Sequence, residues 1–161
     1  MAQKNDNAVL VTKSGLEMLK SELEELKTTR RHEVAQKIKE ATEYGDLSEN
    51  SEYDEAKNEQ AFLEARILEL EQMIKNAEII DDSKTKGNSV GIGMTVVIAS
   101  DREDGEQTYT IVGAVESDPL NGRISNESPV GKAILGKKKG DKVDVKTPSG
   151  SMAYTVIDVR H

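Results

Sequence analysis

The segment EYGDLSENSEYDEA, residues 43–56, holds six carboxylates and no basic side chain. Asp46 and Glu49 are three residues apart, so both face the same side of a turn that enters a helix. Mg²⁺ is commonly held by one or two carboxylates, while water and substrate phosphates supply its other ligands. The spacing therefore indicates half of a magnesium site, which another molecule would complete.

Other ligand chemistries fit this segment less well. An EF-hand loop counted from Asp46 places Ser51 where the turn needs glycine and Lys57 where the bidentate glutamate belongs. A zinc site is disfavoured because the chain has no cysteine and only two histidines, His32 and His161. The sequence shows no complete catalytic motif of a nucleotide-binding or hydrolase type. The remaining alternative is a solvated acidic face, although helix capping would use only one or two acids and add about 1 kcal/mol.

Negative charge is concentrated around the same segment. Residues 40–59 hold eight acids and one base, and so carry −7 of the formal net charge of −8. Such a surface disfavours DNA as a direct ligand and suits a metal ion, a basic groove or solubility. The lack of cysteine fits a reducing cytosol, and no apolar stretch resembles a leader or a membrane span. We expect a cytoplasmic protein without a membrane partner.

Two heptad-like segments flank the acids and must position them. The first begins near Ser14, a predicted N-cap, and keeps a narrow apolar stripe to about residue 43. The second keeps a similar stripe over residues 56–77. A short turn joins them, with Asp46 or Ser48 as predicted cap of the second helix, so the pattern predicts an antiparallel coiled-coil hairpin. A compact bundle is the alternative, but no third amphipathic helix is visible.

The second half of the chain has a different composition. A loop rich in glycine and serine, residues 83–93, precedes four β-patterned runs at residues 94–99, 107–112, 142–147 and 153–159. Between them, SPVGKAILG predicts one short helix, with Ser128 as N-cap, Pro129 at the first position and Gly136 as the stop. The predicted fold class is α+β, with a helical hairpin over residues 1–78 and a small antiparallel-sheet domain over residues 79–161.

Two stretches of this sequence carry a family resemblance. EATEYGDLSENSEYDEAKNEQAFLEARILELEQMI and ISNESPVGKAILGKKKGDKVDVKTPSG resemble the bacterial Gre transcript cleavage factors, most closely the GreA type, within a similarity that spans residues 12–159. The resemblance implies an N-terminal coiled-coil hairpin and an FKBP-like domain that docks on RNA polymerase at the rim of its secondary channel. It implies that the hairpin enters this channel and that Asp46 and Glu49 help to hold a Mg²⁺ ion shared with the polymerase. The polymerase then hydrolyses backtracked RNA, and the factor is an accessory protein rather than an enzyme.

Other positions receive roles by the same resemblance. The predicted supports of the hairpin tip are Tyr44, Gly45, Leu47, Asn50 and Tyr53. Lys57 is the candidate RNA contact, because family tips often carry bases at the positions of Thr42 and Ser48, which are neutral here. Ser128 and Pro129 are placed near the polymerase-docking surface, chiefly as helix-start residues. Arg30 and Arg31 are interpreted as solvated coiled-coil charges, with contact to RNA or to a channel wall as the alternative.

The sequence leaves three alternatives to cleavage stimulation. A related architecture would also serve a regulator that blocks the secondary channel without promoting hydrolysis, and the intact Asp46 and Glu49 argue against it. A coiled-coil holdase would need apolar surface near the tip, where Leu47 is the one large aliphatic residue. Prolyl isomerase activity is disfavoured because Tyr109 and Tyr154 are the only aromatics of the second half. The nascent RNA 3′ end is expected to be an indirect partner, and the free protein a monomer.

Overall fold

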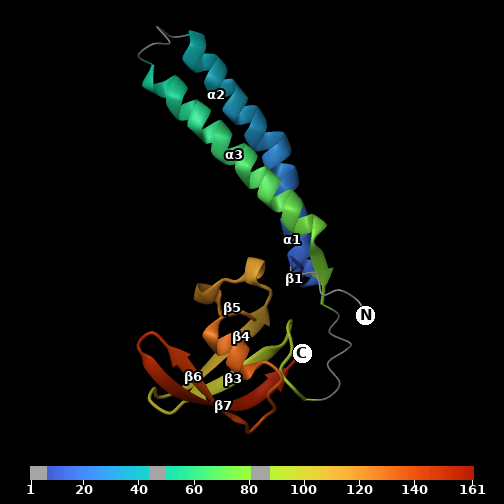
Figure 1. Ribbon diagram of the computed structural model, residues 1–161, viewed down its shortest axis with the longest axis vertical. Helices are drawn as coiled ribbons and strands as arrows, with labels where there is room; N and C mark the ends of the chain where they lie inside the picture. Colours follow the sequence, from blue (N-terminus) through green and yellow to red (C-terminus); the bar gives the residue numbers. More distant parts are fainter. Residues whose placement is uncertain (1–6, 44–49, 81–87) are drawn as a thin grey trace. The chain divides into compact units, whose positions relative to one another are not determined.

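The computed structural model describes residues 7–43, 50–80 and 88–161 (Figure 1). Contacts divide the chain into a helical unit, Leu16–Asn76, and a globular unit that joins the residues up to Gly15 with Ala77–His161. The predicted boundary after residue 78 lies two residues later than this one, and the prediction placed the residues up to Gly15 with the hairpin. The strand β1 (Val9–Val11) pairs in parallel with β2 (Ala77–Ile79), which places the first described residues with the second half of the chain.

The helical unit is an antiparallel hairpin, as predicted. Its first arm passes through α1 (Lys13–Glu25), the π-helical segment η1 (Leu26–Arg30) and α2 (Arg31–Glu43), and its second arm is α3 (Ser51–Lys75). Figure 1 shows α2 and α3 side by side. Their buried seam is narrow: Val34, Leu63 and Ile67 form a cluster with three half-buried neighbours from the first arm. Other buried hydrophobic residues of the two arms are Leu19, Ala41, Ala56 and Leu70. Such a thin core leaves most of each helix in contact with solvent.

Local details of the first arm differ from the sequence prediction. The helix begins at Lys13 and not after Ser14, because the Thr12 hydroxyl accepts the Gly15 backbone N–H at 3.0 Å and so provides the cap. The π-helical segment was not predicted. Within it the Thr28 hydroxyl donates to the Glu24 carbonyl at 2.8 Å, a side-chain bond that competes with regular helix bonding.

The start of the second arm also corrects a prediction. Asn50, rather than Asp46 or Ser48, caps α3, and its Oδ1 accepts the backbone N–H groups of Glu52 and Tyr53 at 3.1 and 3.2 Å. Because the helix begins at Ser51, the residue that can supply this cap is the one directly before it. Asp46 and Ser48 lie outside the described residues.

A five-stranded sheet forms the globular unit, in the order β5-β4-β3-β7-β6. The strands are β3 (Thr95–Ser100), β4 (Glu106–Val112), β5 (Arg123–Ser125), β6 (Lys142–Thr147) and β7 (Gly150–Arg160). All four predicted runs form strands with antiparallel pairing, whereas the short β5 was missed and pairs in parallel with β4. Two 3₁₀ turns, η3 (Ala114–Glu116) and η4 (Pro119–Asn121), connect β4 to β5. The fold is therefore α+β, as predicted.

One short helix, α4 (Pro129–Ile134), packs on this sheet and follows the predicted pattern. The Ser128 hydroxyl accepts the Gly131 N–H at 3.0 Å, Pro129 occupies the first turn, and Gly136 follows the helix with a φ of 77°. Ile134 is fully buried among the sheet's aliphatic side chains. Across residues 7–43, 50–80 and 88–161, no helix has the length and apolarity needed to cross a membrane.

Candidate functional site at the end of the hairpin

The acidic end of the hairpin, defined as residues 40–59, is described in part. Six predicted site residues or neighbours lie outside the described residues: Tyr44, Gly45, Asp46, Leu47, Ser48 and Glu49. The predicted metal ligands therefore have no described geometry. What the structure gives is their immediate surroundings, which are the last turn of α2 and the first two turns of α3.

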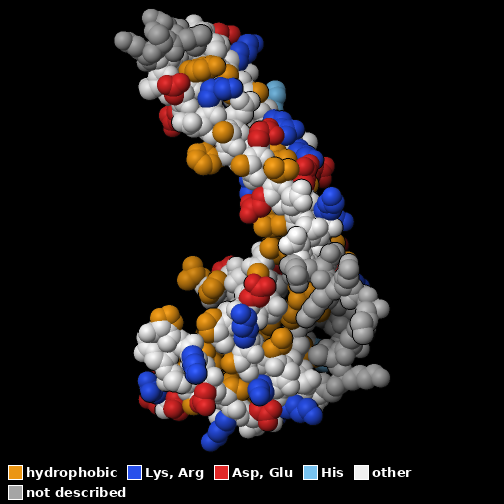
Figure 2. All heavy atoms as spheres, in the orientation of Figure 1, with side chains coloured by type: hydrophobic (Ala, Val, Ile, Leu, Met, Phe, Trp, Pro, Cys, Tyr) orange, Lys and Arg blue, Asp and Glu red, His pale blue; other side chains and the backbone are white. Residues whose placement is uncertain are grey.

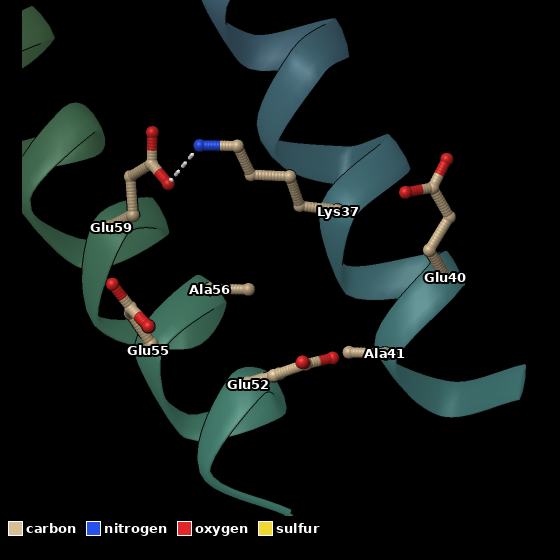
Figure 3. A pocket seen from close by; sticks show the side chains of 7 residues that line it. All are labelled: Lys37, Glu40, Ala41, Glu52, Glu55, Ala56 and Glu59. Carbon is tan, nitrogen blue, oxygen red and sulfur yellow. Dashed lines mark hydrogen bonds and ion pairs between the residues drawn. The ribbon is translucent and has the colours of Figure 1, made fainter. Parts of the chain in front are cut away.

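Asn50 fastens the two helices together at this end. Besides capping α3, its Nδ2 donates to the Ala41 carbonyl of α2 at 2.6 Å. Ala41 and Ala56 are each 4% exposed, and Figure 3 shows both methyl groups pointing into the space between the helices. Small residues allow the two backbones to approach closely, so the flanks of the acidic turn are held by a side-chain bond and a tight packing contact. Tyr53, a predicted tip support, is half-buried in the first turn of α3.

A hollow of about 340 Å³ lies between α2 and α3 at this end. Its lining, drawn in Figure 3, consists of Lys37, Glu40, Ala41, Glu52, Glu55, Ala56 and Glu59. Lys37 Nζ pairs with Glu59 Oε2 at 2.7 Å, and Glu52 extends from α3 toward α2. Four carboxylates thus share the hollow with a single cation, so its field is negative. Within the described residues, no three acidic or histidine side chains converge closely enough to hold a metal ion.

Farther from the end, several charges of the hairpin are paired between its arms. Arg31 binds Glu64 through two hydrogen bonds of 2.8 and 2.7 Å, and Arg66 binds Glu22 at 2.9 Å. The hydrogen bond from Arg31 lowers the pKa of the Glu64 carboxyl below its ordinary value. Figure 2 shows basic and acidic side chains interspersed along the hairpin. The pairing accords with the interpretation of the arginines as coiled-coil charges.

The acids nearest the turn differ from these pairs. Glu52, Asp54 and Glu55 are exposed, and none forms an ion pair with another residue of the described ranges. Lys57, the candidate RNA contact, is exposed and donates to Gln60 Oε1 at 2.8 Å. Because they are exposed and form no described ion pair, these carboxylates are open to an external ligand.

The neutral and globular-unit positions have local roles. The Thr42 hydroxyl donates to the Lys39 carbonyl at 2.6 Å, so it is turned back on its own helix. Ser128 Oγ also donates to the Ser125 carbonyl at 2.7 Å, which leaves Pro129 as the exposed member of that predicted pair. Sequence reasoning did not single out Leu120, which is 98% exposed in η4, because one leucine in a polar loop carries no pattern.

Taken together, the fold and the site define a protein with a charged helical hairpin and a small α+β domain. A family model described as "Transcription elongation factor, N-terminal" matches residues 9–79, and one described as "Transcription elongation factor, GreA/GreB, C-term" matches residues 84–161. The chain therefore belongs to the GreA/GreB family of transcription elongation factors.

Individual relatives cover nearly the whole chain. It is 55% identical over 152 residues to the transcription elongation factor GreA of Thermoanaerobacter pseudethanolicus, a match that covers 94% of this chain and 97% of the relative. The chain is 52% identical over 150 residues to the transcription elongation factor GreA of Bacillus cytotoxicus, a match that covers 93% of this chain and 95% of the relative. The chain is also 31% identical in sequence to GreA factor homolog 1 of Thermus thermophilus. The crystal structure of that protein matches with a TM-score of 0.43, and the match covers 96% of this chain and 99% of that one.

Proposed function

We propose that this chain binds bacterial RNA polymerase through its globular unit and inserts the acidic end of its hairpin through the polymerase's secondary channel. There it stimulates the polymerase's own hydrolysis of backtracked RNA and so rescues arrested complexes. Membership of a family of transcription elongation factors supports a role in transcription elongation. The observation that carries the proposal is a contrast within the hairpin. On its shaft, the part away from the turn, acids such as Glu22 and Glu64 pair with arginines of the opposite arm. The exposed acids in the first turns of α3 form no ion pair with a described residue.

The chain's contribution is a set of positioned carboxylates. Asp46 and Glu49 are the proposed ligands of a Mg²⁺ ion shared with the polymerase, and Mg²⁺ prefers such oxygen ligands. The donor set fits the ion, because the flanking Glu43 and Glu52 add negative charge and neither has a described cationic partner. When bound, a second metal ion stabilises charge on the attacking or the leaving oxygen of the displacement. Asn50 would keep the two flanks of the acidic turn at a fixed separation, through its bond to Ala41.

Few side chains at the end of the hairpin are suited to contact RNA. Lys57 Nζ uses one of its three N–H donors on Gln60, which leaves two for a phosphate oxygen. The Thr42 hydroxyl is occupied by the backbone of its own helix. We therefore expect the RNA to be held chiefly by the polymerase, with the chain acting on the reacting phosphate through the shared ion.

The experiment uses a backtracked elongation complex with 3′-end-labelled RNA. Wild-type protein is expected to release short labelled fragments, whereas Asp46→Asn and Glu49→Gln should bind the polymerase and release none. Asp54→Asn is the matched control, because Asp54 is an exposed acid of the same hairpin end with no assigned role.

The outcomes separate the mechanisms. Full stimulation by Asp46→Asn would refute delivery of a metal ligand by this residue. A wild-type protein that binds, releases no fragment and slows elongation would instead establish the alternative, a regulator that blocks the channel.

A further inference from the structure

Among the described residues, Glu116 is the one charged residue that is buried. It ends η3 in the globular unit, and its side chain is only 2% exposed. A carboxylate removed from water is unfavourable unless its oxygens receive hydrogen bonds or a charge partner. The burial of Glu116 therefore requires partners for its carboxylate, which a short connecting turn alone does not provide.

The hydrogen-bond donors to Glu116 belong to Thr12, 104 residues earlier in the chain. Oε2 accepts the Thr12 backbone N–H at 2.9 Å, and Oε1 accepts the Thr12 hydroxyl at 2.5 Å. Arg123 Nη2 lies 3.6 Å from Oε1 and supplies a positive charge. Both carboxylate oxygens are thus engaged, and two of the three contacts go to the residue that precedes α1.

Thr12 also connects Glu116 to the start of α1. The oxygen that donates its proton to Glu116 accepts the Gly15 N–H at 3.0 Å, and so caps the first turn of α1. A carboxylate at this place also complements the positive end of the helix dipole. Glu116 therefore binds the cap of α1 as well as the backbone before it.

Two glycines leave the space that this arrangement requires. A Cβ on Gly15 would lie 2.1 Å from Glu116 Cδ, and one on Gly113 would lie 2.0 Å from the Leu10 carbonyl oxygen. Any side chain at either position would displace the carboxylate or the strand β1. The surroundings of Glu116 are thus closed by the backbone on both sides.

We propose that Glu116 is a positioning residue that anchors the first turn of α1 to the globular unit. Because α1 continues past Gly15 to Glu25, the anchor restrains the direction in which the hairpin leaves that unit. The second arm returns through Asn76 into β2, which is paired with β1 next to the same anchor. The inference rests on the proposed function in one respect, since the acidic end must reach a fixed point in the polymerase.

The test uses the absence of native cysteine. Spin labels on Asn58→Cys in α3 and Lys146→Cys in β6, both exposed positions, report the distance distribution between the two units in the free protein. Glu116→Gln keeps the size of the side chain and removes its charge. It should broaden this distribution at a temperature where both units remain folded by circular dichroism. Glu106→Gln, an exposed glutamate of β4, is the matched control and should leave the distribution unchanged.

A distribution of wild-type width in Glu116→Gln would overturn the proposal. If that variant does not fold, Thr12→Val and Thr12→Ser give the same test, because only the serine retains the hydroxyl that donates to Glu116. Broadening in the valine variant alone supports the anchor, and equal widths in both overturn it.

A second readout connects the anchor to the proposed function. With polymerase, Glu116→Gln should retain binding and lose cleavage stimulation, whereas full stimulation would overturn the positioning role. Failure of the wild-type protein to stimulate cleavage would refute the proposed function alone, because the distance measurement contains no polymerase.

Discussion

The chain uses the same functional group in opposite ways at the anchor and at the end of its hairpin. Glu116 is buried, and both of its oxygens receive hydrogen bonds from Thr12 or charge from Arg123. Asp54 and Glu55 are exposed and form no ion pair with a described residue. A carboxylate whose bonds are complete within the protein stabilises the fold, whereas one left open to solvent is available to a ligand. The environment, and not the residue type, assigns the role.

The shaft of the hairpin provides an intermediate case. Glu64 and Arg31 form a bidentate pair, yet both side chains are almost half exposed, at 47% and 46%. Exposed pairs of this kind contribute little to stability, because solvent and salt screen them. The shaft pairs therefore neutralise charge along the arm and set its register, while stability comes from the narrow seam around Val34, Leu63 and Ile67.

The largest expected effect comes from closing the space at the anchor. Gly113 has a φ of −66°, so alanine is conformationally acceptable there, but its Cβ would meet the Leu10 carbonyl oxygen. We expect Gly113→Ala to lower the free energy of unfolding of the globular unit by about 3 kcal/mol, because the backbone of β1 must move. Chemical denaturation followed by near-ultraviolet circular dichroism measures this. A loss below about 1 kcal/mol would show that β1 yields easily and that the anchor is not rigid.

A matched pair of substitutions tests the comparison itself. Glu116→Ala should cost about 2 kcal/mol, because it leaves the partly buried Thr12 donors without their charged acceptor. The same change at Glu55 should stay within about 0.5 kcal/mol, since an exposed carboxylate is removed from the surface of α3. Equal costs in denaturant melts of the two variants would contradict the contrast between an acid that holds the fold and an acid that the fold does not need.

Features with a sequence period were predictable, and features that depend on a single distant contact were not. The apolar stripes predicted the hairpin, and alternating runs predicted four of the sheet strands. The three-residue strands β1, β2 and β5 are too short to show alternation. Glu116 lies in a short turn of mixed composition, and its partner Thr12 is 104 residues away. No local pattern distinguishes such a residue from a surface acid.

The candidate site at the end of the hairpin also combines features that the sequence predicted with features that only the structure shows. The density of acids in residues 40–59 was evident from composition, as was the scarcity of bases around them. The bond from Asn50 to Ala41 required the structure, because it joins two helices whose facing positions depend on where each one ends. The caps were misassigned by two residues at Ser14 and by at least two at Ser48, for the same reason. Several polar residues at each helix start can supply a cap, and tertiary contacts select among them.

The smallest predicted effect concerns the ion pair between Arg31 and Glu64, and it is the direction in which the stability of this pair changes with pH. The hydrogen bond from Arg31 lowers the pKa of Glu64 in the folded protein, so the pair contributes stability above the ordinary glutamate pKa of about 4.3. That contribution is lost as the pH falls through the lowered pKa, because protonation removes the charge that Arg31 binds. Wild type should therefore melt slightly above Glu64→Gln at neutral pH, by helical circular dichroism, and the two curves should converge in acid. A difference that persisted in acid would mean that Glu64 acts through packing, and the shaft would then resemble the anchor rather than the open end of the hairpin.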